Sequence, residues 1–391
     1  MILSQILILS TLAISQFNTA HNPKLIELGY KGIDYIYSIK PFKAREIFEQ
    51  ISKEYPGHPF GSFGIAMSKW AEFEYLDEQT DFSLYEEYHR LTEKAIEDGK
   101  RWVEKNPSDA YAMMCLGGTY GLLARLYLTQ HKWIKAYFAG RRAVSNMRKA
   151  LEMDPQLYDA YLGLGLWEYS AGTLPSIIKI LSVFLISGNP RRGIEYLRLC
   201  ADKGYFNKTA AQLLLIEILT QTDSKYSNPS LAVEYSRQLV KRYPQLAQMQ
   251  FVLIVSLYEA KMYDEAEKEM KEYLSRIERG VESYYPKYYP RIYLSLGTLY
   301  MVKGELDMAY DYFKKASEFI EKEGKPTRWA VWALVRMGNI YDLKGERDMA
   351  VTMYKKALSY PDNWGFKDYI EENIKSPFNL KKYLATQLPP P

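Results

Sequence analysis

The feature that most constrains the fold is a stretch near the end of the sequence that closely repeats the stretch before it. Residues 328–358 carry small and aromatic residues in a fixed order, and the same order occurs one copy earlier. The matching pairs are Gly297 and Gly338, Tyr300 and Tyr341, Gly304 and Gly345, Ala309 and Ala350, Phe313 and Tyr354, and Ala316 and Ala357. Self-similarity at a fixed period is the sequence signature of a repeat architecture.

The residue types in this repeat predict a pair of packed helices. Leu334, Met337 and Tyr341 recur at i, i+3 and i+7, which is one apolar stripe of a helix. Small side chains at Gly338 and Ala350 allow two helices to approach closely. Gly345 can take the left-handed conformation that ends the first helix. Because one such hairpin cannot bury its apolar face alone, the pattern predicts a stack of hairpins.

The same template can be laid along the chain from Leu25 onward, giving about eight copies. The small position of the first helix falls at Gly32, Ala66, Gly117, Gly165, Leu215, Ile254, Gly297 and Gly338. That of the second helix falls at Ala44, Ala95, Ala143, Gly193, Ala232, Ala266, Ala309 and Ala350, all of them Ala or Gly. Prolines that cannot continue a helix close four copies, at Pro56, Pro107, Pro155 and Pro244. The prediction is an all-α solenoid without strands.

This spacing resembles the tetratricopeptide repeat (TPR), over nearly all of residues 25–362. The resemblance implies a right-handed superhelix of helix pairs that binds a protein or peptide on its concave face, which is lined mainly by the first helices. Counted from the glycines of the last two copies, the ligand-facing positions are Arg291, Leu294, Thr298, Met301, Trp332, Val335, Asn339 and Asp342. Of these, Asn339, Arg291, Asp342, Trp332 and Thr298 are the residues expected to bind a partner. Asn339 matches the family's recurrent peptide-binding asparagine, although an asparagine there can also satisfy local backbone groups.

The predicted organisation has four parts. Residues 1–20 are a signal peptide, 21–279 hold repeats one to six with insertions in two to four, and 280–364 hold repeats seven and eight. Residues 365–391 form a capping helix, from Phe366 to Tyr383, and a loose tail. The insertions are expected to lengthen helices or to add a small one at the turn.

The first 20 residues contain no charged side chain and carry an apolar run from Ile2 to Ile14. The length of the run suits a secretory signal, with cleavage before Gln16 or before His21, and it is too short and interrupted to span a bilayer comfortably. No Lys or Arg precedes the run, so a first packed helix of the array is the alternative. Export would place the chain in the periplasm, at the envelope or outside the cell.

Composition and motifs argue against several functions. The net charge is +4, from 51 basic and 47 acidic residues, which gives no case for nucleic-acid binding. The four histidines are scattered, and no metal-ligand spacing, phosphate loop or nucleophile elbow occurs. We therefore expect no enzyme, cofactor or metal. Cys115 and Cys200 are expected to be free and buried. A disulfide is the alternative if the chain is exported.

Three stretches each allow two interpretations. The tyrosines of residues 283–290 could form an exposed shelf or wedge a repeat junction. Residues 175–187, apolar around most of a helix, could be a buried insertion or contact a membrane or partner. The basic run from His131 to Lys149 could hold an acidic partner or be a solvated helix face. The predicted function is thus a non-enzymatic interaction scaffold, the alternative being a membrane-associated assembly factor that uses residues 175–187. The sequence does not indicate an oligomeric state.

Overall fold

The structure is a computed structural model that describes residues 17–76, 83–173, 188–324, 326–361, 364–382 and 386–389. These residues form helices joined by turns, and none of them lies in a strand. The chain divides into two compact units, Met1–Gln212 (unit 1) and Leu213–Pro391 (unit 2). The all-α helical-repeat fold predicted from the sequence is confirmed.

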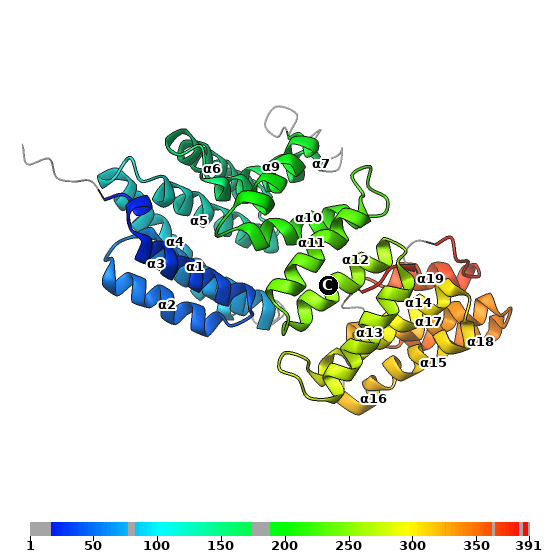
Figure 1. The fold of residues 1–391 in the computed structure, drawn as a ribbon. Helices are drawn as coiled ribbons and strands as arrows, with labels where there is room; N and C mark the ends of the chain where they lie inside the picture. Colours follow the sequence, from blue (N-terminus) through cyan, green and yellow to red (C-terminus); the bar gives the residue numbers. More distant parts are fainter. Residues whose placement is uncertain are drawn as a thin grey trace, which may run out of the picture. The chain divides into compact units, whose positions relative to one another are not determined.

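Unit 1 consists of antiparallel helix pairs (Figure 1). Its helices are α1 (Pro23–Tyr37), α2 (Pro41–Glu54), α3 (Pro59–Ala71), α4 (Ser83–Lys105), α5 (Ala110–Thr129), α6 (Trp133–Met153), α7 (Tyr161–Thr173) and α9 (Pro190–Lys203). Helices α4, α5 and α6 have 23, 20 and 21 residues, against 15 and 12 for α14 and α15 of unit 2. The extra length in repeats two and three therefore extends helices, as expected. The segment 175–187 lies outside the described residues.

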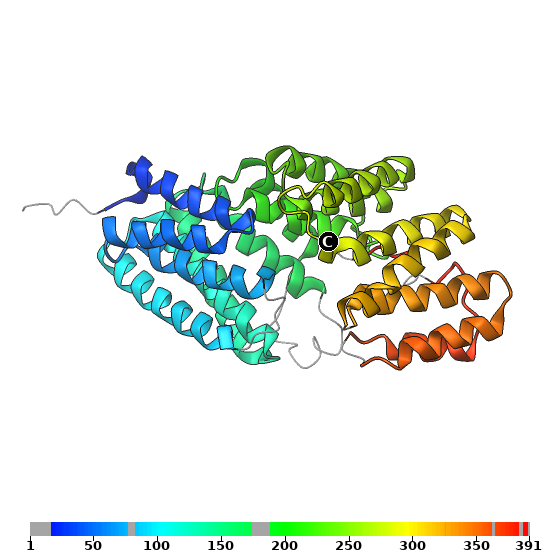
Figure 2. The same ribbon diagram turned by 90° about the horizontal axis from the view of Figure 1, so that it is seen from below.

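Unit 2 continues the helix pairs, which stack in chain order (Figure 2). Helix α10 (Lys208–Leu219) crosses the division between the units. The remaining helices are α11 (Pro229–Arg242), α12 (Ala247–Glu259), α13 (Tyr263–Glu278), α14 (Tyr289–Lys303), α15 (Leu306–Ser317), α16 (Phe319–Glu323), α17 (Arg328–Leu343), α18 (Arg347–Leu358) and α19 (Lys367–Lys375).

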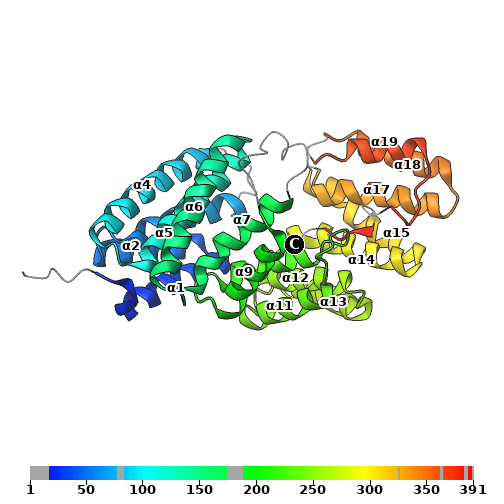
Figure 3. The ribbon, with the colours of Figure 1, turned by 90° about the horizontal axis from the view of Figure 1, so that it is seen from above.

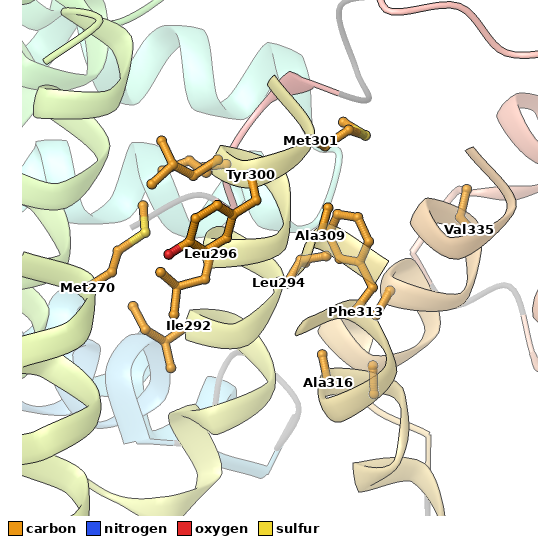
Figure 4. Packing of buried hydrophobic residues seen from close by; sticks show 14 of the residues in the cluster. Met270, Ile292, Leu294, Leu296, Tyr300, Met301, Ala309, Phe313, Ala316 and Val335 are labelled. Atoms are coloured by element: carbon orange, nitrogen blue, oxygen red, sulfur yellow. The ribbon is translucent and has the colours of Figure 1, made fainter. Parts of the chain in front are cut away.

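Close approach of two helices explains the small residues of the repeat. A Cβ atom placed on Gly297 or Gly338 would lie 2.5 Å from the ring of Phe313 or Tyr354, respectively. Each pair of small positions predicted from the sequence falls on two helices that follow one another among the described residues, from Gly32 on α1 with Ala44 on α2 to Gly338 on α17 with Ala350 on α18. Aromatic side chains of the second helix thus fill the space that a side chain would otherwise take. Figure 4 shows Phe313 packed in this way beside Leu294 and Ala309.

Five of the turns between the two helices of a pair contain a left-handed residue. In the last two pairs this residue is a glycine, Gly304 (φ 83°) and Gly345 (φ 78°), as the sequence predicts for Gly345. Three earlier pairs place Ile39, His131 and Lys261 in the same conformation, with φ between 55° and 59°. These side chains are accommodated at a conformational cost that glycine avoids.

The tyrosine-rich stretch 283–290 wedges a repeat junction. The Tyr284 side chain is buried and its hydroxyl donates to Gln250 Oε1 at 2.7 Å, while Arg276 Nη1 donates to the same hydroxyl at 2.8 Å. Pro290 lies in the first turn of α14, where its missing N–H costs nothing. Tyr285 is half exposed, but Tyr288 and Tyr289 are half-buried, so the four tyrosines do not form one continuous exposed shelf.

The end of the chain differs from the prediction in two ways. Helix α19 ends at Lys375 rather than near Tyr383, because Ser376 is extended, as expected before the proline at position 377. The tail is not loose throughout, because Leu388 is only 8% exposed and belongs to the core cluster of unit 2.

Candidate functional site

The residues expected to bind a partner lie on the first helices of the last two pairs in unit 2. We call the surface formed by α12, α14 and α17, the first helices of three successive pairs, the first-helix face. Arg291 and Thr298 come from α14, whereas Trp332, Asn339 and Asp342 come from α17. Trp332 is half-buried and the other four side chains are buried, so only Trp332 among the five is partly open to solvent.

Asp342 is the centre of a buried polar cluster. Its carboxylate accepts hydrogen bonds from Arg347 Nη1, the Tyr354 hydroxyl and the Phe378 main-chain N–H, each at 2.8 Å. Asn339 Nδ2 in turn donates to the Tyr354 hydroxyl at 2.9 Å. Burial, followed by the Asp342 carboxylate, raises the pKa of Tyr354, which therefore stays protonated and donates. The cluster joins α17 to α18 and to the segment that follows α19.

The other three predicted residues also contact this chain itself. The Arg291 guanidinium lies over the Phe251 ring at 3.9 Å, a cation–π contact between α14 and α12. Thr298 donates to the Leu294 carbonyl of its own helix at 2.8 Å. Trp332 packs against Phe366, with ring centroids 4.6 Å apart. In this state the predicted site is filled by packing inside unit 2.

A segment of the tail lies against the first-helix face. The Tyr258 hydroxyl of α12 donates to the Thr386 carbonyl at 2.5 Å, and Arg336 Nη2 of α17 donates to the Gln387 carbonyl at 2.6 Å. Leu388 follows with its side chain buried. The tail, drawn in red, runs to this position beyond α19 (Figure 3). Two side-chain donors from different helix pairs thus hold one short segment by its main-chain carbonyls.

Arg336 is an unusual residue for the interior of a helix stack. Its side chain is among the largest that are fully buried, and burial lowers the pKa of its guanidinium to about 10. The charge is therefore kept at neutral pH in a place where guanidinium hydrogen bonds are strong. The buried Arg336 guanidinium can therefore bind a hydrogen-bond acceptor from another segment, such as a main-chain carbonyl or a carboxylate.

Sequence reasoning missed both donors. Tyr258 occupies, in the sixth repeat, the place that Asp342 has in the eighth, four residues after the small position of the first helix. The sixth repeat has Ile254 where most of the others have a small residue, so its spacing gives no clear ligand-facing positions. Arg336 falls between the expected ligand positions, and only its charge within the apolar stretch from Val331 to Met337 marked it.

Unit 1 contains a second buried polar cluster, at the start of the described chain. The Thr19 hydroxyl lies 2.7 Å from His58 Nε2 and donates to Asp109 Oδ2 at 2.8 Å. Trp102 Nε1 donates to the same carboxylate oxygen at 3.1 Å, and the Phe17 ring packs edge-on against Trp102 with centroids 5.2 Å apart. The N-terminal segment is thereby fixed to the starts of α3 and α5, which His58 and Asp109 cap.

The residue types of this cluster are those of a hydrolase triad, but the direction of its hydrogen bonds is wrong for one. The Phe60 main-chain N–H donates to His58 Nδ1 at 3.2 Å, so in the neutral ring the proton is on Nε2. Nε2 then donates to the Thr19 oxygen, and the hydroxyl proton points to Asp109. With no basic nitrogen facing it, Thr19 has no base to activate it as a nucleophile. The cluster has a structural role.

The other polar features of the described residues give little support for a ligand site or a reaction. A surface cavity of about 350 Å³ between α6, α7 and α9 is lined by Arg148, Glu152, Glu168 and Arg192, among others. Glu168 accepts from Arg192 Nη2 at 2.7 Å, so its charge is already paired. The cysteines are free and buried, as predicted, and burial raises the pKa of both thiols. Within the described ranges no group of three or more His, Cys, Asp or Glu side chains could hold a metal ion.

Comparison with known proteins supports the repeat assignment where the sequence signal is strongest. A family model described as Tetratricopeptide repeat matches residues 288–360, which hold α14, α15, α17 and α18. These residues are tetratricopeptide repeats. No curated protein shows significant similarity to the sequence. The TPR match thus covers the last two helix pairs of the chain.

Several solved structures are similar at low identity. A crystal structure of Rap protein complexed with competence and sporulation factor is 14% identical, with 89% of this chain and 79% of that chain covered and a TM-score of 0.43. A tetratricopeptide repeat protein from Parabacteroides merdae is also 14% identical, over 90% and 97% of the chains, with a TM-score of 0.31. The C-terminal part of a TPR protein from Cytophaga hutchinsonii is 14% identical, with 87% of this chain and 98% of that chain covered and a TM-score of 0.32. At these TM-scores the likenesses carry no argument about function.

Proposed function

We propose that this chain is a non-enzymatic interaction scaffold whose first-helix face in unit 2 binds an extended peptide or protein segment. The observation that carries the proposal is the pair of donors, Tyr258 and Arg336, that hold a chain segment by its main-chain carbonyls. Carbonyls are present in every peptide, so these donors suit partners of varied sequence. The TPR match at residues 288–360 supports the same surface. Among the predicted residues, such a partner would contact the half-buried Trp332, while the buried Arg291, Thr298, Asn339 and Asp342 would support the face from beneath.

Photo-crosslinking in the cells that make the chain tests this proposal. A photo-reactive phenylalanine replaces Tyr258 on the first-helix face or, as a control, Tyr285, which is half exposed elsewhere in unit 2. We expect an intermolecular adduct of defined mass from position 258 and not from position 285. The proposal fails if position 258 gives no intermolecular adduct, or if both positions give the same ones.

We further propose that the chain is exported and that processing leaves Phe17 in the mature protein. The support is the buried contact of Phe17 and Thr19 with His58 and Asp109, which cleavage before His21 would remove. Cleavage before Gln16 keeps it. N-terminal sequencing of the exported protein tests this proposal. A mature chain that begins at His21, or an unprocessed chain found only inside the cell, would contradict it.

A second candidate function is contact with an anionic membrane surface, and one observation favours it. Trp133, Ile134 and Phe138 of α6 are 58%, 75% and 52% exposed, and they alternate with exposed Lys132 and Lys135. Apolar side chains beside cations are the pattern of interfacial membrane contacts. Among the described helices, none is long and apolar enough to cross a bilayer. This patch replaces residues 175–187 as the part of the chain on which the alternative rests.

Cosedimentation with vesicles of phosphatidylglycerol and phosphatidylcholine separates the candidates. If the patch contacts lipid, the chain binds and Trp133→Ser/Ile134→Ser abolishes binding, whereas Phe42→Ser on α2, which is 60% exposed, does not. If the wild-type chain stays in the supernatant, membrane contact through α6 is excluded.

A further inference from the structure

We infer that residues Thr386–Pro389 are a built-in competitor for the first-helix face of unit 2, and that a partner must displace them to bind. This inference rests on the proposed function, since it names how the same face is regulated. It also defines the partner chemistry: a short segment that presents two successive main-chain carbonyls, followed by an apolar side chain.

The tail makes the contacts that a bound peptide would make. Its two hydrogen bonds use the carbonyls of Thr386 and Gln387, and the donors are side chains of α12 and α17, two helix pairs apart. Neither bond depends on the side chain of the tail residue. The Leu388 side chain supplies the apolar part, packed in the core cluster of unit 2. This division between main-chain hydrogen bonds and one apolar anchor is typical of extended-peptide recognition.

The composition of the tail fits this role. Residues 389–391 are all proline, which fixes φ and has no N–H to leave unsatisfied. Leu388 comes directly before Pro389 and is therefore restricted to extended conformations before it binds, so less conformational entropy is lost there. A partner segment with the same features would bind for the same reason.

The attachment is local, which makes displacement feasible while unit 2 stays folded. Helix α19 is anchored through buried Tyr369, Ile370 and Asn373. Between α19 and the docked segment, Leu380 is 42% exposed and Lys381 is also exposed. The buried anchors of α19 lie outside the docked segment, so its release does not require α19 to leave α18.

Peptide binding to the full-length chain tests the inference. The probe is a fluorescent synthetic peptide with the sequence of residues 383–391, YLATQLPPP. The protein variant Leu388→Asp places a carboxylate where the buried leucine lies and should release the tail. The matched control is Leu380→Asp, which makes the same change at the exposed leucine of the same segment.

We expect the peptide to bind the Leu388→Asp chain at least tenfold more tightly than the wild-type or Leu380→Asp chain. A tethered segment has an effective concentration on the order of millimolar. If the segment binds the face with a dissociation constant of about 0.1 mM, the tethered copy weakens the apparent affinity of a free peptide roughly tenfold. A peptide in which Asp replaces the leucine that corresponds to Leu388 should bind none of the three protein chains. Circular dichroism confirms that the variants are folded.

Two results overturn the inference: equal peptide binding to all three chains, or no binding to a folded Leu388→Asp chain. These results are separable from failure of the proposed function. An intermolecular adduct at position 258 in cells without peptide binding would retain the scaffold and reject the competing tail. Peptide binding without any adduct in cells would retain the docked tail and reject the scaffold.

Discussion

The guanidinium of Arg336, buried in the middle of α17, donates a 2.6 Å hydrogen bond to the main-chain carbonyl of Gln387. The two residues are 51 positions apart in the sequence, and the contact ties the end of the described chain to the face that would receive a ligand. The structure thus shows the candidate site in a closed state.

Removing this guanidinium should loosen the tail. A hydrogen bond to a charged group contributes about 1.5–3 kcal/mol, so the population with a released tail should rise roughly tenfold or more in Arg336→Met. Tryptic cleavage after Lys381 and Lys382 measures the released population. Arg328→Met, which removes an exposed arginine from the same helix, is the control. Equal cleavage rates in the two variants would show that Arg336 does not hold the tail.

Thr19 should stabilise unit 1 through its hydroxyl. Thr19→Val keeps the shape but removes the donor to Asp109, leaving a buried carboxylate with one partner fewer. We expect a loss of about 1–3 kcal/mol in the free energy of unfolding, measured by urea titration. Thr19→Ser retains the hydroxyl and should unfold nearly as the wild type does. Equal losses in both variants would assign the effect to packing of the methyl group.

The same cluster should make unit 1 less stable at mildly acidic pH. Burial lowers the pKa of His58 in the folded state below its ordinary value of 6.5, although Asp109 nearby opposes this shift. The unfolded chain therefore binds a proton that the folded chain does not, and linkage favours unfolding as the pH falls below about 6.5. The pKa of Asp109 is also lowered, by hydrogen bonds that outweigh its burial, so its contribution is lost only near pH 4 and below.

Melting temperatures at pH 7.5 and 5.5 check this prediction. The wild-type chain should melt at a lower temperature at pH 5.5, and His58→Asn, whose side chain can still cap α3, should show a smaller difference. A pH dependence that is identical in the two chains would mean that His58 does not titrate on unfolding in this range.

Alanine at two helical glycines should have opposite effects. At Gly338 the new Cβ would lie 2.5 Å from the Tyr354 ring, so Gly338→Ala should cost about 1–3 kcal/mol. At Gly121 on α5 nothing lies within 4 Å of the new atom, so Gly121→Ala should gain up to about 1 kcal/mol from helix propensity. Urea unfolding measures both. A gain at Gly338 would contradict the close packing of α17 on α18.

Lys261→Gly should stabilise unit 2, because Lys261 has a φ of 59° at the turn where Gly304 and Gly345 lie in later repeats. We expect a gain of about 0.5–1 kcal/mol, which is the usual cost of a left-handed side chain after allowing for the entropy of glycine. Lys261→Ala, which removes the exposed side chain but keeps a Cβ, should give no gain. Urea unfolding that ranks the alanine variant above the glycine variant would refute this explanation.

The fold could be predicted from the sequence because packing fixes which residues are small. The close approach of α14 to α15 and of α17 to α18 requires Gly297 and Gly338, and these recur visibly in a single sequence. The details of the site could not be predicted in the same way. Asn339 has the residue type that a ligand contact would use, yet its amide donates to Tyr354 inside the repeat. Residue type and spacing do not distinguish these two uses.

The docked tail was the least predictable feature. A leucine followed by three prolines has no periodicity, and its contact with α12 and α17 joins residues far apart in the chain. The donor Tyr258 is also hard to recognise from the sequence, because it lies in a repeat without the first-helix glycine. Contacts of this kind depend on how the successive helices of unit 2 are arranged in space, which sequence spacing does not specify.

The most direct test of this account is photo-crosslinking of the purified full-length chain with a photo-reactive phenylalanine at position 258. If the tail occupies the first-helix face, tryptic digestion and mass spectrometry should find the peptide 383–391 joined to the peptide that contains position 258. Leu388→Asp should abolish this product. Absence of the intramolecular product from the chain with the natural tail, or its equal yield after Leu388→Asp, would contradict the closed state.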